Sequence, residues 1–144
     1  MKEKPLKLGS LKFKMTCLDT DILIGLLKGD KEAITTISKL QRSGEILKTT
    51  IITVYELLKG AMVSSKPQEN LAIVRDMLSN LSILTLSYGS CEEASKIYKN
   101  LKNRGKIMGE FDILIAAIVK NNNETLISRD RHFQLIENLN LKKW

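Results

Sequence analysis

Four acidic residues each stand where an apolar run meets a predicted helix start or a turn: Asp19, Glu56, Asp112 and Asp130. In a parallel α/β sheet such positions converge, because the C-terminal ends of the strands and the loops that leave them line one crevice. Grouped carboxylates there suit Mg²⁺ or Mn²⁺, which prefer carboxylate, water and phosphate oxygens. Such a cation can polarise a phosphodiester oxygen and help to generate a hydroxide nucleophile. The pattern therefore indicates one metal site with hydrolytic chemistry.

Each acid also has an ordinary structural explanation. Thr53 and Glu56 are spaced as a capping box, in which hydroxyl and carboxylate satisfy backbone N–H groups reciprocally. Asp19 and Asp130 could also be helix caps, and acids in a first helical turn suit the helix dipole. Asp112 is harder to explain in this way. It adjoins a helix with hardly any polar face, and a buried carboxylate costs several kcal/mol unless it is paired or metal-bound. Asp112 is therefore the strongest single candidate.

The elements that must position these acids alternate between strands and helices. Apolar runs predict strands over 15–18, 46–52, 81–86 and 125–128, with a further edge strand over 139–144. Helical spacing predicts helices over 20–28, 30–44, 54–63, 67–81, 91–105 and 111–120. This alternation predicts an α/β fold: a three-layer α/β/α sandwich around a central, mostly parallel sheet of about four to five strands.

The apolar pattern also predicts which helix faces are buried. The helix over 111–120 is apolar nearly all round and should be the central buried helix. The Cys91 sulfur should lie in the core. Two other helices should each bury one stripe, formed by Ala33, Ile34, Ile37 and Leu40 and by Cys91, Ala94, Ile97, Tyr98 and Leu101.

Composition indicates one globular domain with an anionic partner. The 144 residues are 43% hydrophobic, enough for a core without disulfides or structural metals. The net charge of +7 favours nucleic acid as the partner. Two cysteines without CxxC spacing argue against a disulfide framework or a zinc site. The chain lacks an apolar stretch near the roughly 18 to 20 residues of a membrane span and has no signal-peptide core, so we expect a cytoplasmic protein without membrane contact.

Residues 1–14 are a basic N-terminal extension with five lysines against Glu3. They supply +4 of the net charge, so the basicity of the chain is partly an effect of this segment. We prefer a flexible, solvated extension, or an upstream start with Met15 as the alternative start, over a dedicated RNA-binding arm. Residues 15–144 are then expected to form a single domain.

Four short segments carry the acids: residues 17–24 (CLDTDILI), 52–60 (ITVYELLKG), 112–117 (DILIAA) and 128–133 (SRDRHF). In this order they resemble the PIN domain family, and the resemblance covers roughly residues 15–144. The connecting positions Gly105, Ile107 and Gly109 also resemble the VapC-type toxins of toxin–antitoxin pairs. Any one segment is a weak signal, whereas the ordered set is a specific one.

The resemblance implies a PIN-like nuclease domain and a Mg²⁺- or Mn²⁺-dependent endoribonuclease that leaves a 5′-phosphate and a 3′-hydroxyl. It implies that the four acids are the catalytic, metal-binding carboxylates. The family's accompanying hydroxyl positions are Thr20, Thr53 and Ser128, with simple capping the alternative for Thr53. A homodimer and a cognate antitoxin that occupies the crevice are also implied. His132 stands where relatives can carry a further carboxylate, and we expect a partly buried side chain rather than a metal ligand.

Contacts to RNA are less visible than the chemistry. Basic residues that flank the predicted crevice are candidates for phosphate contacts, although such residues are more often solvated surface. They are Lys59, Arg104, Lys106, Arg129 and Arg131. Aromatic residues make up only 5% of the chain and form no stacking array, so base recognition by exposed rings is not indicated.

Two other functions stay open. A catalytically inactive PIN-like module, binding RNA or protein, would bind RNA in a salt-sensitive way without turnover, but the complete set of acids argues against it. A phosphoryl-transfer domain is suggested by Asp19 and Asp21, because aspartate nucleophiles of phosphatases also follow a first strand. Leu23 breaks that phosphatase pattern, and Glu56 has no role in it.

Overall fold

A five-stranded, all-parallel sheet forms the centre of the protein in a computed structural model that describes residues 15–144. The predicted basic extension, residues 1–14, lies outside the described residues. The strand order is β3-β2-β1-β4-β5. The strands are β1 (Thr16–Leu18), β2 (Leu47–Thr50), β3 (Ser82–Leu84), β4 (Thr125–Ile127) and β5 (Leu141–Lys142). The predicted sheet of four to five mostly parallel strands is thus confirmed, and the predicted edge strand pairs with β4.

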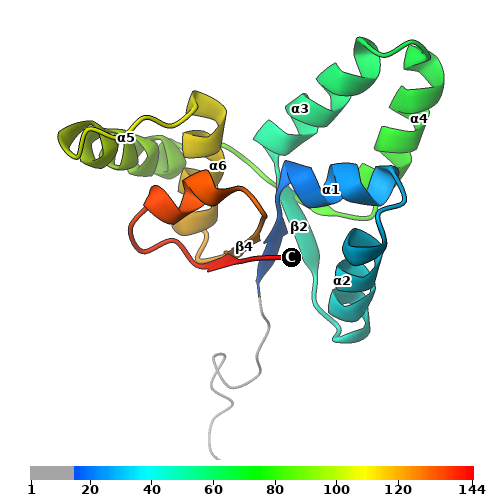
Figure 1. The fold of residues 1–144 in the computed structure, drawn as a ribbon, viewed down its shortest axis with the longest axis horizontal. Helices are drawn as coiled ribbons and strands as arrows, with labels where there is room; N and C mark the ends of the chain where they lie inside the picture. Colours follow the sequence, from blue (N-terminus) through cyan, green and yellow to red (C-terminus); the bar gives the residue numbers. More distant parts are fainter. Residues whose placement is uncertain (1–14) are drawn as a thin grey trace, which may run out of the picture.

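Six α-helices and one short 3₁₀ helix connect and flank the strands (Figure 1). Helices α3 and α4 lie on one side of the strands, and α5 and α6 lie on the other. The elements are α1 (Thr20–Leu27), α2 (Lys31–Arg42), α3 (Ile51–Met62), α4 (Pro67–Leu78), α5 (Tyr88–Asn103), α6 (Glu110–Asn121) and η1 (Arg131–Leu135).

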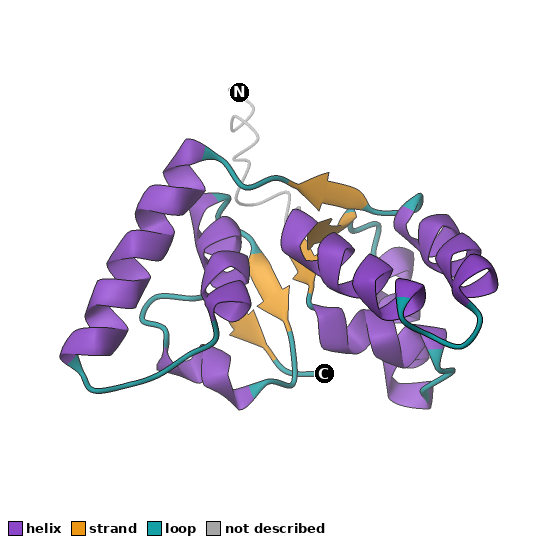
Figure 2. Ribbon diagram, turned by 90° about the horizontal axis from the view of Figure 1, so that it is seen from above, coloured by secondary structure: helices purple, strands orange, loops and turns teal. Residues whose placement is uncertain are grey.

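Two hydrophobic cores cover the two faces of the sheet, because neighbouring residues of a strand point to opposite faces. Cys17 and Leu126 belong to the core under α5, α6 and η1. The next residues, Leu18 and Ile127, belong to the core under α1 to α4. Figure 2 shows the resulting layers, with helices on either side of the strands. The predicted three-layer sandwich is confirmed.

The central strand β1 is buried along its whole length and pairs with β2 on one side and β4 on the other. The chain leaves β1 through α1 and α2 to β2 on one side of it, and returns later through α6 to β4 on the other side. Ligands of open α/β sheets bind at such a switch point, beyond the C-terminal ends of the strands. Asp19, the residue after β1, therefore stands at the position where this fold class builds its sites.

Helix α6 is the central buried helix that its composition predicted. Five consecutive residues, from Ile115 to Val119, are almost fully buried. The neighbouring helix α5 differs from the prediction: Cys91 is exposed and Ser90 is buried instead. The apolar stripe therefore begins one residue earlier, and Tyr98 stays 49% exposed. The prediction was wrong because a polar residue, Ser90, occupies a buried position that the apolar periodicity assigned to Cys91.

Two further predictions about the helices were wrong, one about a buried face and one about a helix start. Ile34 was predicted to face the core of α2 but is 42% exposed, because α2 buries only Ala33, Ile37 and Leu40. Helix α3 begins at Ile51, three residues before the predicted start, and shortens β2 accordingly. In the described part of the chain, no helix is long and apolar enough to cross a membrane.

Candidate active site

Asp19 is the most deeply placed of the four acids, with 5% of its surface exposed. It occupies the N-cap position of α1, but its side chain makes no capping hydrogen bond with the described residues. Instead the Ser128 hydroxyl donates to Asp19 Oδ2 at 2.6 Å. Burial, together with the nearby charges of Asp21 and Asp112, raises the pKa of Asp19 to about 7. Asp19 therefore stands at the N-cap position as predicted, but its side chain does not accept a hydrogen bond from the first turn of α1, so the capping explanation is wrong.

Glu56 reaches toward α1 rather than toward its own helix start. The Thr20 hydroxyl donates to Glu56 Oε1 at 2.8 Å and lies 3.0 Å from the Thr53 hydroxyl. The predicted capping box is wrong, because the true N-cap of α3 is Thr50, whose hydroxyl accepts from the Thr53 backbone N–H at 3.2 Å. Thr53 is thus a buried residue of the first helical turn, which places Glu56 one turn further along α3.

Asp112 lies in the first turn of α6 and is half-buried rather than fully buried as the sequence suggested. Partial burial and the carboxylates of Asp130 and Glu56 raise its pKa, whereas His132 lowers it. Asp112 is therefore electrostatically coupled to the other three acids, since it also acts on Asp19. The acids from four separate elements gather at one edge of the sheet.

Asp130 is the one acid for which the capping explanation holds. Its Oδ1 accepts from the His132 backbone N–H at 2.9 Å, and this fixes the start of η1. The same oxygen lies 2.8 Å from Nδ1 of the His132 ring. The prediction of a partly buried histidine is wrong, because His132 is exposed and pairs with Asp130 at the rim of the acid group.

The donor set suits a hard divalent cation, since it consists of carboxylate and hydroxyl oxygens. Within residues 15–144, no group of three or more acidic, histidine or cysteine side chains is arranged so that it could hold a metal ion as it stands. The four acids therefore form a looser group. Mg²⁺ usually keeps several waters and binds through one or two carboxylates, so an open group of repelling carboxylates fits such an ion. A bound cation would offset the repulsion that raises the pKa of Asp112.

Asp21 is a functional candidate that the site prediction missed. Its carboxylate accepts from the Arg129 backbone N–H at 2.7 Å and from the Trp144 indole N–H at 3.0 Å. It also lies 3.3 Å from the Ser128 hydroxyl. The signal in the sequence was its spacing of two residues from Asp19, which we considered only as a phosphatase pattern.

Two of the five predicted RNA contacts are engaged within the protein. The Arg104 guanidinium donates to the backbone oxygen of Leu135 at 2.8 Å and so joins α5 to η1. The Arg129 guanidinium lies 3.5 Å over the Trp144 ring and pairs with Glu32. These contacts hold distant segments together, which leaves both arginines less available for phosphate than the sequence suggested.

Lys59, Lys106 and Arg131 are exposed. The Lys59 ammonium lies 5.1 Å from the ring centre of Tyr55 and 5.5 Å from that of Phe111. These two rings meet edge to face at 5.6 Å, and they adjoin Glu56 and Asp112 in the sequence. Among the described residues, none of the three basic side chains forms an ion pair. All three stay candidates for contacts to RNA.

The sequence matches the family described as PIN domain over residues 16–139. It is 32% identical over 128 residues to "Ribonuclease VapC2" of Haemophilus influenzae, which covers 88% of this chain and 96% of that protein. Over a span of the same length it is 24% identical to "tRNA(fMet)-specific endonuclease VapC" of Shigella flexneri. The predicted family resemblance is therefore confirmed.

Solved structures lead to the same group of proteins. VapBC2 from Rickettsia felis, bound to a DNA fragment from its promoter, gives a TM-score of 0.83 at 26% identity, covering 90% of this chain and 98% of that one. DNA-bound VapBC from Salmonella typhimurium gives 0.82 at 27% identity, with the same coverage. With the acids in the family's order and the family pattern matched over residues 16–139, this chain belongs to the PIN domain family, in the group that includes the VapC ribonucleases.

Proposed function

We propose that this protein is a divalent-metal-dependent endoribonuclease that hydrolyses RNA phosphodiester bonds and acts as the toxin of a toxin–antitoxin pair. The observation that carries the proposal is the group of four coupled carboxylates beyond the C-terminal ends of the strands. It occurs in a chain with 32% identity across 96% of a protein named as a VapC ribonuclease.

Asp19, Glu56, Asp112 and Asp130 are the residues that would hold the metal, and Mg²⁺ or Mn²⁺ matches their oxygen chemistry. When bound, such an ion polarises a phosphodiester oxygen and lowers the pKa of an attacking water. The protein's own contribution is to bring the carboxylates to one edge of the sheet, where burial and mutual repulsion raise the pKa of Asp19 and of Asp112. The metal itself also offsets the mutual repulsion of the acids.

Neighbouring hydroxyl groups orient two of the acids by hydrogen bonds. Ser128 fixes one oxygen of Asp19, and Thr20 fixes one oxygen of Glu56, so each acid keeps a second oxygen for another partner. Groups that hold the ligands of a metal in this way are worth about 10- to 100-fold in metal affinity or activity. Thr53 supports Thr20 from within α3.

RNA is the proposed substrate. Lys59, Lys106 and Arg131 are the basic side chains that stay exposed, and each is suited to a phosphate contact. Because two relatives, from Shigella flexneri and Salmonella typhimurium, carry the name of a tRNA(fMet)-specific endonuclease, initiator tRNA is the first substrate to test. A cytoplasmic location, where cellular RNA is found, is part of the proposal.

The proposed partner is an antitoxin protein that covers the acid group, together with a second copy of the chain in a homodimer. Support comes from the neighbouring structures, whose names describe complexes of the VapBC type from three bacteria. Expression of the chain alone should arrest growth, whereas co-expression with the product of the adjacent gene should restore it. Growth that is unaffected by the chain alone would contradict the toxin role.

A cleavage assay tests the nuclease itself. Purified protein, initiator tRNA and Mg²⁺ or Mn²⁺ should give products that EDTA abolishes. Asp19→Asn and Asp112→Asn should each reduce the rate by roughly a hundredfold or more, since even outer partners of metal ligands are worth up to about 100-fold. Glu92→Gln is the matched control, because Glu92 is an exposed acid remote from the site. It lies on α5 one turn from Gly89, which approaches the Asn121 side chain at the end of α6 opposite to Asp112.

The outcomes separate enzyme from binding module. Cleavage that EDTA does not stop, or cleavage by Asp112→Asn at the rate of the unmodified protein, would refute a metal-dependent reaction at these acids. Salt-sensitive RNA binding without any turnover would instead identify an inactive PIN-like module.

A further inference from the structure

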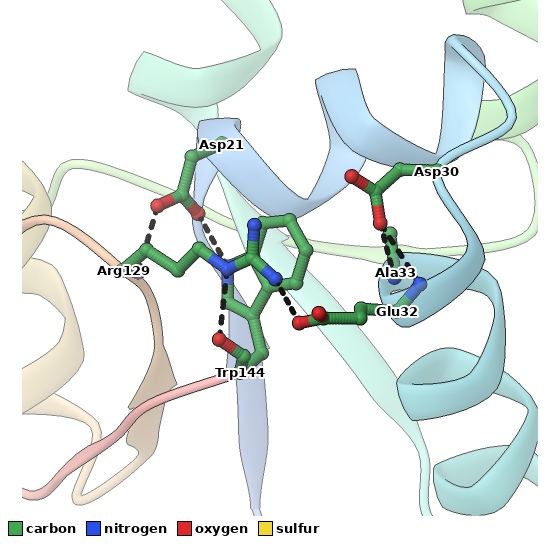
Figure 3. A network of polar contacts seen from close by, with 6 residues as sticks. All are labelled: Asp21, Asp30, Glu32, Ala33, Arg129 and Trp144. Carbon is green, nitrogen blue, oxygen red and sulfur yellow. Dashed lines mark hydrogen bonds and ion pairs between the residues drawn. The ribbon is translucent and has the colours of Figure 1, made fainter.

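Trp144 contacts Arg129, Asp21 and the backbone at Gly25, and Figure 3 shows the first two of these contacts. The Arg129 guanidinium covers its ring at 3.5 Å, and Arg129 Nε donates to its backbone oxygen at 2.8 Å. A Cβ placed on Gly25 would come within 3.1 Å of the ring edge, so glycine allows the indole to approach α1 closely. The indole is therefore a fixed donor rather than a mobile side chain.

The indole N–H is directed at a carboxylate in the first turn of α1. Trp144 Nε1 donates to Asp21 Oδ1 at 3.0 Å. The other oxygen of Asp21 accepts from the Arg129 backbone N–H at 2.7 Å. Figure 3 shows Asp21 between these two donors. Asp21 thus ties α1 to the loop that follows β4.

That loop carries Ser128, which links three of the acids. Its hydroxyl donates to Asp19 Oδ2 at 2.6 Å and lies 3.3 Å from Asp21 Oδ2. Its oxygen also accepts from the Asp130 backbone N–H at 3.0 Å. Any shift of the loop relative to α1 therefore changes the place of Ser128, and with it the orientation of Asp19 and the position of Asp130.

We infer that Asp21 is a positioning residue of the nuclease site, and that the Trp144 indole N–H holds Asp21 in its working orientation. Asp21 acts through the loop and Ser128, so it need not touch the metal or the RNA. The inference rests on the proposed function for its link to catalysis. Its structural part, the fixing of the loop by Asp21 and Trp144, stands on the hydrogen bonds alone.

Trp144→Phe is the informative change, because phenylalanine keeps a ring for Arg129 and removes only the N–H donor. Asp21→Asn keeps the shape of that side chain and replaces one acceptor by a donor. Glu32→Gln is the matched control, since Glu32 pairs with the Arg129 guanidinium in the same network but does not contact Asp21. Thermal unfolding in EDTA establishes that each variant is folded.

Three measurements follow for each variant: hydrogen exchange of the Arg129 amide by NMR, Mn²⁺ affinity by calorimetry, and kcat and KM for RNA cleavage. In Trp144→Phe and Asp21→Asn the Arg129 amide should lose protection. Mn²⁺ affinity and kcat should each fall by roughly tenfold, as expected for an outer partner of a metal ligand, while KM stays unchanged. Glu32→Gln should leave all three readouts unaltered.

Unchanged protection of the Arg129 amide in Trp144→Phe would overturn the role of the indole. Lost protection with unaltered Mn²⁺ affinity would overturn the positioning role of Asp21, because the loop would then move without consequence for the acids. If the unmodified protein does not cleave RNA but both variants weaken Mn²⁺ binding, the proposed function fails while the positioning role holds.

Discussion

Replacing Asp19 by asparagine should stabilise the metal-free protein near neutral pH. Asp19 is 5% exposed and lies among other acids, so its ionised form is costly in the fold. Asparagine has the same shape, and its amide oxygen can still accept from the Ser128 hydroxyl, which now donates to Asp19 at 2.6 Å. The substitution therefore removes the charge while it keeps the packing.

The magnitude follows from the pKa of Asp19, which burial raises from 3.8 to about 7. Each pH unit of difference corresponds to about 1.4 kcal/mol, so ionised Asp19 costs the folded protein up to about 4 kcal/mol. Between pH 3.8 and about 7 the folded state binds more protons than the unfolded state. Stability of the unmodified protein should therefore fall as pH rises through this window and stay constant above it.

Urea unfolding in EDTA at several pH values measures the effect. Asp19→Asn should exceed the unmodified protein by about 2 to 4 kcal/mol at pH 8 and by nearly nothing at pH 4. Glu92→Gln, an exposed acid, should show no such dependence. Equal stability of Asp19→Asn and the unmodified protein across the whole range would refute the reasoning, because it would mean that Asp19 carries its charge without cost. A metal ion should stabilise the unmodified protein more than the variant.

Other changes test the scaffold, each by urea unfolding at pH 7. Lys48→Met should cost about 3 kcal/mol, because it leaves the Glu124 carboxylate buried without its partner at 3.2 Å, and adding Glu124→Gln should recover most of the loss. Thr50→Ala should cost about 1 to 2 kcal/mol through loss of the cap on the Thr53 N–H. Phe133→Ala should cost about 3 to 5 kcal/mol, since this ring is 1% exposed in the core beneath η1. A change of less than about 0.5 kcal/mol in any of the three would contradict the contact concerned.

Much of the fold could be predicted because its signals are local. Short apolar runs bounded by turns predict buried parallel strands, and each of the five strands lies within a segment predicted in this way, although their order in the sheet was not predicted. The errors came where a polar residue substitutes for an apolar one. Ser90 is fully buried because its hydroxyl lies 3.0 Å from that of Ser87 at the start of α5, and periodicity alone assigns such a place to the neighbouring Cys91.

The gathering of the acids could be predicted from topology, whereas their partners could not. Parallel strands send their C-terminal ends to one edge, so residues after β1 and β4 must be neighbours. Which hydroxyl meets which carboxylate depends on one-residue details. The capping box at Thr53 and Glu56 fitted the sequence as well as the true cap at Thr50, and only the earlier start of α3 frees Glu56 to meet Thr20.

Contacts between distant segments could not be predicted from local sequence patterns. Asp21 and Trp144 are 123 residues apart, and neither periodicity nor motif spacing links them. Arg129 illustrates the same limit. As a basic residue near the crevice it suggested a phosphate contact, but its guanidinium stacks on the Trp144 ring and its Nε donates to the Trp144 backbone oxygen, and both contacts depend on the tertiary structure.

Helix ends explain how the fold tolerates so many carboxylates in one place. Helix α6 begins next to Asp112 and α1 begins at Asp19, and in neither case does a side chain among the described residues cap the first turn. Free N–H groups at a helix start carry partial positive charge, which favours nearby anions. Asp112 meets this charge while half-buried, and Asp19 meets it at depth. Two uncapped helix starts facing one acid group thus lower the cost of ionised carboxylates, and the remaining repulsion is what a divalent ion would relieve.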